Sequence, residues 1–490
     1  DEVVPKRNQG ASVGMYILTA AINRAVSPAS TNGLKEWYEK TALPHMTGLK
    51  STLFTPQNFW NNTDITVEQL RTIEDRIFQK SIRTFDINTG DLIYDAKNFF
   101  TYIDTMNPSG LAKRGHDKAK RNDLKTVGLA LLVTPDFSVP VLSETYPGNR
   151  GDSTQFSDMM EQLKLRYRAI VGKDAQITIV FDRGNNSESN LDLLESEGLG
   201  FHYVGGLKKN QVTELFAVSK SNYKPLSCPE DAPEKYKSLT TYRMRATVLG
   251  REATTVIVYN PELEKGQLQG IQINIEKTKS ELLEIQGKLL KRSKGELKKG
   301  KKPTFESVSK AVSKILDHRE YMDDIFEYEI LEKDNHIFLT FSDSEDKLNV
   351  IREGQLGKTA LFTDRSDMSD YEIISAYRSA WHVESSFKQM KDTGFLTVRP
   401  IFHWTDQRIA VHIFICVLAC RLCSLLRKEL HRKGIECSIN QYLKSMNSIN
   451  RVTTFYGDIK KPKKVEAFIS GDELSSRIEE SYKLQEKYYC

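Results

Sequence analysis

One short segment, Tyr377 to Lys391, gathers side chains that could act together on a charged substrate. Its sequence reads YRSAWHVESSFKQMK. If the segment is a single helix, positions three and four residues apart share a stripe along its surface. A neighbouring apolar stripe between Ile373 and Met390 can face the core, which leaves this first stripe free for chemistry. It holds an acid, two lysines and two aromatic residues: Tyr377, Trp381, Glu384, Lys388 and Lys391.

Two aspartates stand where a sheet would place functional acids. Asp95 lies within the apolar segment 92–100, and Asp182 directly follows the β-branched run 177–181; both runs predict strands. Ligands of open α/β sheets gather at the carboxyl ends of strands. Neighbouring carboxylates repel each other and are costly to bury, and a divalent cation removes that repulsion. Oxygen ligands alone favour Mg²⁺ or Mn²⁺ over Zn²⁺.

Each of these residues also has an ordinary interpretation. Asp182 could simply cap the Gly-Asn turn that follows it. Glu384 and Lys388 could form an exposed ion pair, and Trp381 could be a half-buried aromatic residue. Because the chain has 65 Asp and Glu residues, the spacing of acids alone carries little weight. The prediction of a site therefore depends on the local context of each acid.

The elements that must position these residues predict a mixed α/β protein, because strands come first and then alternate with helices. Residues 371–391, 406–433 and 439–446 are each expected to form one helix. The predicted parts are a helical N-terminal region (1–86), the first part of the core (87–206), an inserted β-rich and helical subdomain (207–357), the second part of the core with the Glu384 helix (358–434) and a helical C-terminal region (435–490).

The amino-acid composition indicates the general class of protein but says little about its activity. The chain has 490 residues, 39% hydrophobic and 28% charged, which is typical of a folded protein of several domains. A net charge of +5 permits a nucleic-acid partner without requiring one. Six cysteines without framework spacing, and no signal-peptide pattern, favour a cytoplasmic location. The apolar run 409–426 could span a membrane, but His412 and Arg421 within it favour a core helix.

Two further patterns look like sites and are interpreted otherwise. The segment 354–359, GQLGKT, lacks the glycine that a Walker motif needs at the position of Arg352, so ATP binding is not expected. A stripe of one histidine and three cysteines could hold zinc, but small buried thiols are the preferred interpretation because the helix is apolar. These residues are His412, Cys416, Cys420 and Cys423.

Several motifs in order resemble the DDE transposases of bacterial insertion sequences, the IS-four-like superfamily and its IS-sixteen-thirty-four-like branch. Tyr377, Glu384 and Lys391 fall at the spacing of its Tyr-Arg-Glu-Lys motif. Ala380 stands at the arginine position, where Arg378 could supply the charge instead. The other similar segments are LIYDAKNFF (92–100), GHDKAKRNDL (115–124), PGN (147–149) with Asp152, ITIVFDRGNNS (177–187) and Arg399-Pro400-Ile401.

The resemblance implies a ribonuclease-H-like catalytic core, interrupted by an inserted domain between the second aspartate and the glutamate. It implies that Asp95, Asp182 and Glu384 hold two Mg²⁺ or Mn²⁺ ions, which activate the nucleophile and stabilise the leaving oxygen. The substrate would be double-stranded DNA, both transposon ends and target. Cut 3′ hydroxyls would then attack the target, and a homodimer would hold two ends in a synaptic complex.

The predicted DNA-binding residues lie on and beside the Glu384 helix. Lysines there would neutralise phosphate charge, and Trp381 would stack on an unpaired base. The lysines of 288–302 could follow a DNA backbone or form a solvated loop, and region 1–86 would serve DNA binding or dimerisation. Two rival functions stay open: a nuclease that never joins ends, and a domesticated DNA-binding protein, which the intact acid triad disfavours. The DNA-binding residues are Tyr377, Arg378, Trp381, Lys388 and Lys391.

Overall fold

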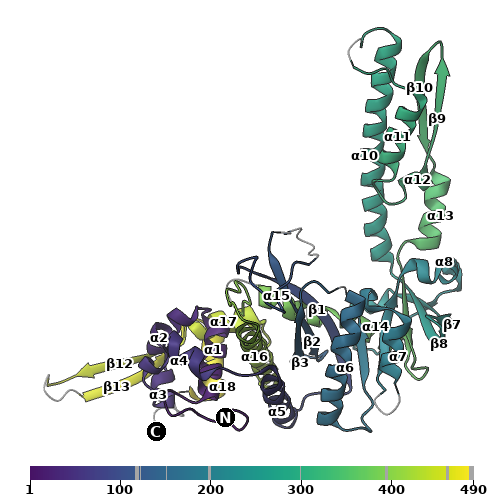
Figure 1. Ribbon diagram of the computed structural model, residues 1–490. Helices are drawn as coiled ribbons and strands as arrows, with labels where there is room; N and C mark the ends of the chain where they lie inside the picture. Colours follow the sequence, from purple (N-terminus) through teal and green to yellow (C-terminus); the bar gives the residue numbers. More distant parts are fainter. Residues whose placement is uncertain are drawn as a thin grey trace. The chain divides into compact units, whose positions relative to one another are not determined.

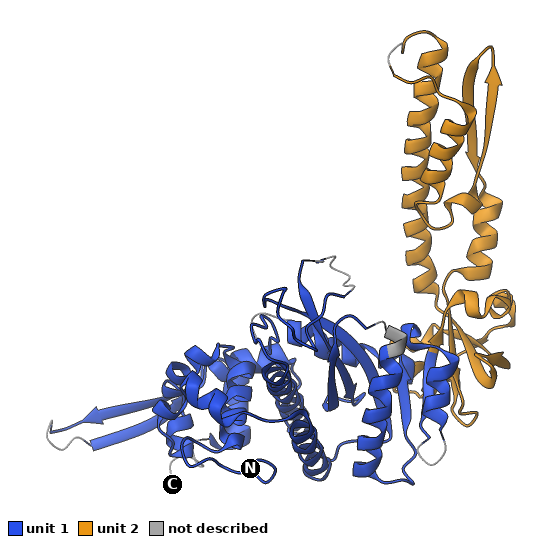
Figure 2. Cartoon of the chain, in the orientation of Figure 1, with its two compact units in different colours: residues 1–205, 376–490 blue, residues 206–375 orange. Residues whose placement is uncertain are grey.

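The computed structural model describes residues 1–115, 121, 123–150, 152–196, 200–297, 300–391, 396–458 and 463–484. The chain forms two compact units, residues 1–205 with 376–490 and residues 206–375 (Figure 2). Both contain strands and helices, so the mixed α/β class is confirmed. Most of the motif at 115–124 and the side chain of Asp152 lie outside the described residues.

Helices account for most of residues 13–85, the part of the chain that precedes the first strand. Side-chain caps start these helices: the Ser12 hydroxyl accepts a hydrogen bond from Met15 N, and Thr66 and Gln69 form a capping box. Their apolar faces form one core with helices from the end of the chain, around the fully buried Tyr16, which lies against Phe54. The helices are α1 (Val13–Val26), α2 (Thr31–Glu39), α3 (Leu43–Thr47), α4 (Pro56–Asn62) and α5 (Val67–Phe85).

A mixed sheet follows in the first unit, with the strand order β3-β2-β1-β4-β5 (Figure 1). The first three strands are antiparallel neighbours, and β4 and β5 run parallel to β1. Strand β2 is buried along its whole length, which explains its unbroken apolar sequence. The strands are β1 (Asp91–Thr101), β2 (Lys125–Val133), β3 (Pro140–Pro147), β4 (Thr178–Phe181) and β5 (His202–Leu207).

Helices cover both faces of this sheet. On one face, the Phe156 ring of α6 contacts the rings of Tyr94 and Phe181. On the other face, the Phe387 ring of α15 lies 6.2 Å from that of Phe99 in β1, and α16 packs along β3. These helices are α6 (Asp152–Val171), α15 (Trp381–Lys391) and α16 (Asp406–Arg432); α7 (Glu188–Glu195) packs beside α6.

Helix α16 is the one described helix long and apolar enough to cross a membrane, judged by length and composition. In this protein 89% of its most apolar window is buried. The Arg421 side chain is 2% exposed and donates hydrogen bonds to the carbonyls of Pro140 and Val141, at 2.6 and 2.8 Å. A buried arginine bonded to a strand fits a core helix, as predicted.

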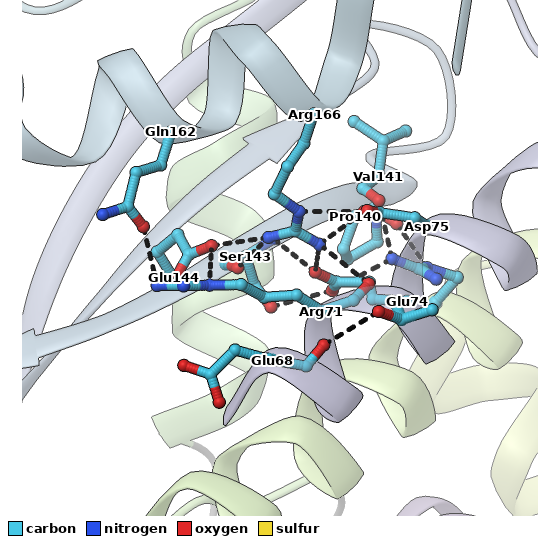
Figure 3. A network of polar contacts seen from close by, with 12 residues as sticks. Glu68, Arg71, Glu74, Asp75, Pro140, Val141, Ser143, Glu144, Gln162 and Arg166 are labelled. Carbon is cyan, nitrogen blue, oxygen red and sulfur yellow. Dashed lines mark hydrogen bonds and ion pairs between the residues drawn. The ribbon is translucent and has the colours of Figure 1, made fainter. Parts of the chain in front are cut away.

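A network of buried ion pairs joins α5 to β3, α6 and α16 (Figure 3). Glu74 of α5 pairs with Arg421 at 3.2 Å and with Arg166 of α6 at 2.8 Å. Arg166 also binds Glu144 of β3 at 2.6 Å, and Arg71 pairs with the same carboxylate. Helices α5 and α16, which are far apart in the sequence, are thereby both fixed to β3.

The C-terminal region corrects one prediction, since it is only partly helical. Helices α17 (Ile439–Asn447) and α18 (Glu473–Tyr482) flank an antiparallel hairpin of β12 (Asn450–Tyr456) and β13 (Lys463–Ile469). The run VTTFY at 452–456 is β-branched and aromatic, and such residues favour extended backbone over helix. Local β-propensity therefore outweighs the helical character of the surrounding sequence.

The second unit has its own strands, in the order β11-β8-β7-β6, and its own apolar core around Leu282 and Val312. Strand β11 pairs with β8, so this unit continues to residue 375. The five-part division of the chain stays a prediction. The unit's elements are α8 (Thr213–Phe216), β6 (Lys224–Pro225), α9 (Glu234–Lys237), β7 (Thr240–Val248), β8 (Arg251–Tyr259), α10 (Pro261–Ser293), α11 (Phe305–Leu316), α12 (Met322–Ile325), β9 (Phe326–Lys333), β10 (His336–Asp343), α13 (Glu345–Gln355), β11 (Lys358–Thr363) and most of α14 (Asp370–Arg378).

Candidate active site

The register of β1 and β4 places the two predicted aspartates side by side. These parallel strands pair Asp91 with Thr178 and Ile93 with Val180. Two residues further along the same register, Asp95 lies opposite Asp182, the residue that directly follows β4. Burial raises the pKa of Asp95, and repulsion from the nearby Asp182 carboxylate adds to this rise. Strand pairing alone therefore brings the two acids together.

The face of β1 that carries Asp95 is the face covered by α15. Side chains alternate along a strand, so Asp95, Lys97 and Phe99 point the same way, and Phe99 contacts α15. The Lys97 ammonium forms an ion pair with Asp95, with Nζ 3.0 Å from Oδ2. Asp95 is 14% exposed and Lys97 is 31% exposed, so the pair is largely shielded from water.

All three predicted acids act on the Lys97 ammonium. Burial lowers the pKa of Lys97, but attraction to Asp95, Glu384 and Asp182 outweighs it and raises the pKa above its ordinary value. Burial also raises the pKa of Asp95, which Lys97 and the Ala96 amide only partly oppose. The exposed Glu384 of α15 thus faces the same cation as the two aspartates of the sheet.

Asp182 has a second set of neighbours on its far side. Its Oδ1 accepts a hydrogen bond from the Arg183 amide at 2.8 Å, so the ordinary capping interpretation is also met. The Arg183 side chain hydrogen-bonds the Tyr377 hydroxyl. Burial raises the pKa of Tyr377, to which Asp182 adds while Arg183 lowers it. Tyr377 therefore lies beside Asp182, as its predicted place in the site requires.

The prediction of one continuous helix from 371 to 391 is wrong, because the chain breaks between α14 and α15. At the break, Ser379 N bonds to Ala376 O at 3.1 Å and Ala380 N to Tyr377 O at 3.1 Å, which are the shorter bonds of a tightened turn. The Ser379 hydroxyl also bonds to the Ala376 carbonyl. Tyr377 therefore does not share a helix with Glu384, and the single stripe begins only at Trp381.

The other predicted DNA-binding residues occupy different surroundings. Trp381 is 52% exposed, lies against His382 with ring centroids 3.9 Å apart, and lines a hollow with Phe137 rather than with the three acids. Lys388 and Lys391 are exposed on α15, and the Lys391 ammonium lies 5.7 Å from the Phe99 ring. Arg378, at the end of α14, is half-buried.

The donor chemistry of this site fits a divalent cation. Among the described residues, no three His, Cys, Asp or Glu side chains stand close enough together, as oriented, to enclose a metal ion. Lys97 forms an ion pair with Asp95, and Asp182 and Glu384 attract the same ammonium electrostatically. Three carboxylates around a cation suit Mg²⁺ or Mn²⁺, which prefer oxygen ligands.

Two residues of the site were missed by sequence reasoning. Lys97 is two positions after Asp95 in a strand, so strand alternation was a sufficient signal for its placement. Arg183 directly follows Asp182 and was regarded only as part of a turn. The thiols of the other candidate cluster are buried, and burial raises the pKa of Cys416 and of Cys423 to about 11, as the preferred interpretation expects.

Comparison with known families decides the identity of this arrangement. Residues 91–420 match the model of the family described as the transposase DDE domain, which is more than half of the chain. The chain belongs to this family. The match confirms the resemblance to DDE transposases and is consistent with the IS-four-like branch. It begins at the first residue of β1 and includes all three predicted acids.

Solved structures of transposases are also similar to this DDE transposase family member. One is the piggyBac transposase synaptic complex with hairpin DNA, at 10% identity and a TM-score of 0.38, covering 89% of this chain and 69% of that chain. Another is the Mos1 transposase paired-end complex with left transposon end, at 13% identity and a TM-score of 0.16, covering 40% of this chain and 60% of that one. No curated protein matches. TM-scores this low do not establish a shared fold, so the identification depends on the family model.

Proposed function

We propose that this chain cuts the ends of an insertion sequence and joins the 3′ hydroxyls to target DNA, with Asp95, Asp182 and Glu384 as metal ligands. The observation that carries the proposal is the register of β1 and β4, which sets Asp95 beside Asp182, with Glu384 acting on the Lys97 ammonium that pairs with Asp95. The family match supports transposition as the reaction, and the order β3-β2-β1-β4-β5 supports a ribonuclease-H-like core. Membership of this family makes double-stranded DNA, both transposon ends and target, the expected partner.

The cofactor would be two Mg²⁺ or Mn²⁺ ions, which activate the attacking oxygen and stabilise the leaving oxygen when bound. Asp95 and Asp182 supply ligands from adjacent strands, and Glu384 supplies one from α15 across the same face. In the absence of metal, Lys97 neutralises part of their charge. Arg183, bonded to Tyr377, fixes a guanidinium beside Asp182, where it can contact a phosphate of the substrate.

The exposed side of α15 would direct the DNA strand towards these acids. Lys388 and Lys391 follow Glu384 by about one and two helical turns, so their charges can bind successive phosphates. Arg378 would add a cation near the break between the helices. Trp381, half exposed at the start of α15, has a free surface on which a base can stack.

A cleavage and strand-transfer assay tests this function. The substrate is labelled DNA with the inverted repeats that flank the coding sequence, incubated with Mg²⁺ or Mn²⁺. Asp182→Asn and Glu384→Gln keep the side-chain shapes and should each lower the cleavage rate by at least about 100-fold, the scale of losing one major electrostatic group in an active site. Glu161→Gln, an exposed acid of α6, is the matched control and should cut normally.

The products separate the proposal from its rivals. Cut ends joined to target DNA, lost in both variants, agree with a transposase. Cutting without joining favours a nuclease, and binding without cutting favours a domesticated DNA-binding protein. A synaptic homodimer and a cytoplasmic location are further parts of the proposal; light scattering with and without end DNA measures the first of these.

A further inference from the structure

A cavity of about 510 Å³ lies in the first unit between α1, the α1–α2 turn, α4 and the segment that precedes α16. We call it the Arg24 pocket. None of the three predicted metal-binding carboxylates lines this pocket. Its volume falls in the usual range for small-ligand sites, about 300–1,000 Å³. Residues that line it include Arg24, Trp60, Arg399, Phe402, His403 and His412.

The charge of the Arg24 pocket is positive and has no counter-ion among its described lining residues, none of which is an Asp or Glu. The Nε atoms of Arg24 and Arg399 are both buried, and neither has a hydrogen-bond partner in the described part of the chain. Within the described residues, the Arg24 guanidinium donates one hydrogen bond, a long one to the Ala29 carbonyl at 3.4 Å. Buried cationic donors without partners are costly, so an anion is the expected occupant.

The aromatic and histidine rings that line the Arg24 pocket carry no charge at pH 7. Burial, together with the nearby Arg24, lowers the pKa of His403 to about 4 and that of His412 to about 3, so both are neutral at pH 7. The Trp60 and His403 rings meet edge to face with centroids 4.8 Å apart, and Phe402 is 57% exposed. Phosphate alone would use only the arginines, whereas a nucleobase would also use these rings.

The pocket adjoins the far end of the strand that carries Asp95. Thr101, the last residue of β1, forms a parallel bridge with Ile401, and Tyr102 N bonds to Ile401 O at 2.8 Å. The Arg399 guanidinium lies over the Phe100 ring at 4.8 Å. Asp95 and Thr101 are six residue steps apart along β1, about 20 Å at a rise of about 3.3 Å per residue. One DNA strand could therefore reach both places over roughly six nucleotides of duplex.

We propose that the Arg24 pocket binds one unpaired nucleotide of a DNA strand, with its phosphate at Arg24 and Arg399 and its base against Trp60 and Phe402. This inference rests on the proposed function for the presence of DNA, but it assigns a second contact outside the carboxylate site. It predicts that the protein prefers DNA with a single-stranded extension over blunt duplex of the same sequence.

The test is equilibrium binding of labelled DNA to the full chain in EDTA, so that no cutting occurs. The probes are a blunt duplex and the same duplex with a short unpaired extension. Arg399→Gln and Phe402→Ala should each reduce binding of the extended probe, Phe402→Ala by about 5- to 150-fold, the fold-change equivalent of losing one base–aromatic stack. Binding of the blunt duplex should be unchanged. Arg83→Gln and Phe455→Ala, exposed residues of the same unit, are the matched controls.

Several results would overturn the proposal. If the wild-type protein binds both probes equally, the proposed role of the Arg24 pocket is wrong but the proposed function is unaffected. If it binds no DNA, both proposals are wrong. Variants that weaken both probes alike indicate general charge loss. Effective competition by dAMP or inorganic phosphate alone, at concentrations near that of the probe, points to a free nucleotide or an adventitious anion. Photocrosslinking of an iodinated base in the extension to Trp60 or Phe402 gives a positive result that does not depend on a variant folding correctly.

Discussion

At the scale of single residues, Lys97 serves as a counter-ion to the acids of the candidate active site. The sheet sets Asp95 beside Asp182, and the repulsion between their carboxylates opposes the ionisation of Asp95. The Lys97 ammonium, two positions from Asp95 along the strand, reduces that repulsion. We expect a bound metal ion to take over this role, so that Lys97 stabilises the site when the metal is absent.

Lys97→Met should therefore separate stability from metal response. The metal-free variant should lose about 1–2 kcal/mol, between the values for exposed and buried ion pairs. Mn²⁺ should then stabilise it more than it stabilises the wild type, because no ammonium competes for the carboxylates. Thermal unfolding with and without Mn²⁺ measures both effects. Lys80→Met, an exposed lysine of α5, is the control, and a weaker Mn²⁺ response in Lys97→Met would contradict this role.

The pH dependence of metal binding follows from Asp95, whose pKa is raised by burial. A carboxyl with a raised pKa in the folded state contributes stability below its unfolded pKa, and this is lost as the pH rises through the folded value. Protons therefore compete with Mn²⁺ at higher pH than for an ordinary aspartate. Calorimetric titration with Mn²⁺ from pH 5 to 7 should show affinity rising with pH. Asp95→Asn should bind more weakly and with a flatter profile; an unchanged slope would disprove the assignment.

At the scale of elements, Glu74 connects α5 to the rest of the unit. Glu74→Ala leaves Arg421 buried without its carboxylate, which should cost about 3–5 kcal/mol. Glu74→Gln keeps a hydrogen-bond acceptor and should cost less. Urea unfolding of the first unit measures both, with Glu68→Ala, an exposed acid of the same helix, as the control. A loss below about 1 kcal/mol would show that the carbonyls of Pro140 and Val141 satisfy Arg421 by themselves.

Much of this unit could be predicted because its elements have strong local patterns. The apolar runs of β1 and β4 and the long α16 were predicted within a few residues, and the positions of Asp95 in the first strand and of Asp182 after the second followed from them. The break after Arg378 could not be found, because Ser379 and Ala380 are tolerated inside helices and only the local bonding shows the turn. The cluster around Lys97 needed the pairing of β1 with β4 and the position of α15, which are tertiary facts.

At the scale of the whole molecule, the long segment of the second unit is a separate folding element. The segment begins after β8 and ends before β11, and these two strands pair with each other. The Gln267 side chain accepts a hydrogen bond from Gly357 N at 2.7 Å, so the two ends of the segment lie together. Its apolar core, around Leu282, Val312 and Leu339, lies between those ends.

Replacing residues 268–355 with a Gly-Ser linker of about six residues should therefore leave the remaining fold intact, since such a linker spans roughly 13 Å. Calorimetry of the shortened chain should keep the main unfolding transition of the first unit within a few degrees. Circular dichroism should lose helix in proportion to the residues removed. Aggregation of the shortened chain, or loss of the first unit's transition, would show that the segment is required for the rest to fold.

Helix α16 also has a consequence for how the chain is made. Its length and composition would suit a membrane span, and in the folded chain it is buried mainly against α1, α5 and β3. All three partners are translated earlier, so a completed surface is waiting when α16 emerges. We therefore expect a chain without its early helices to leave the apolar surface of α16 exposed, so that it aggregates or binds membranes.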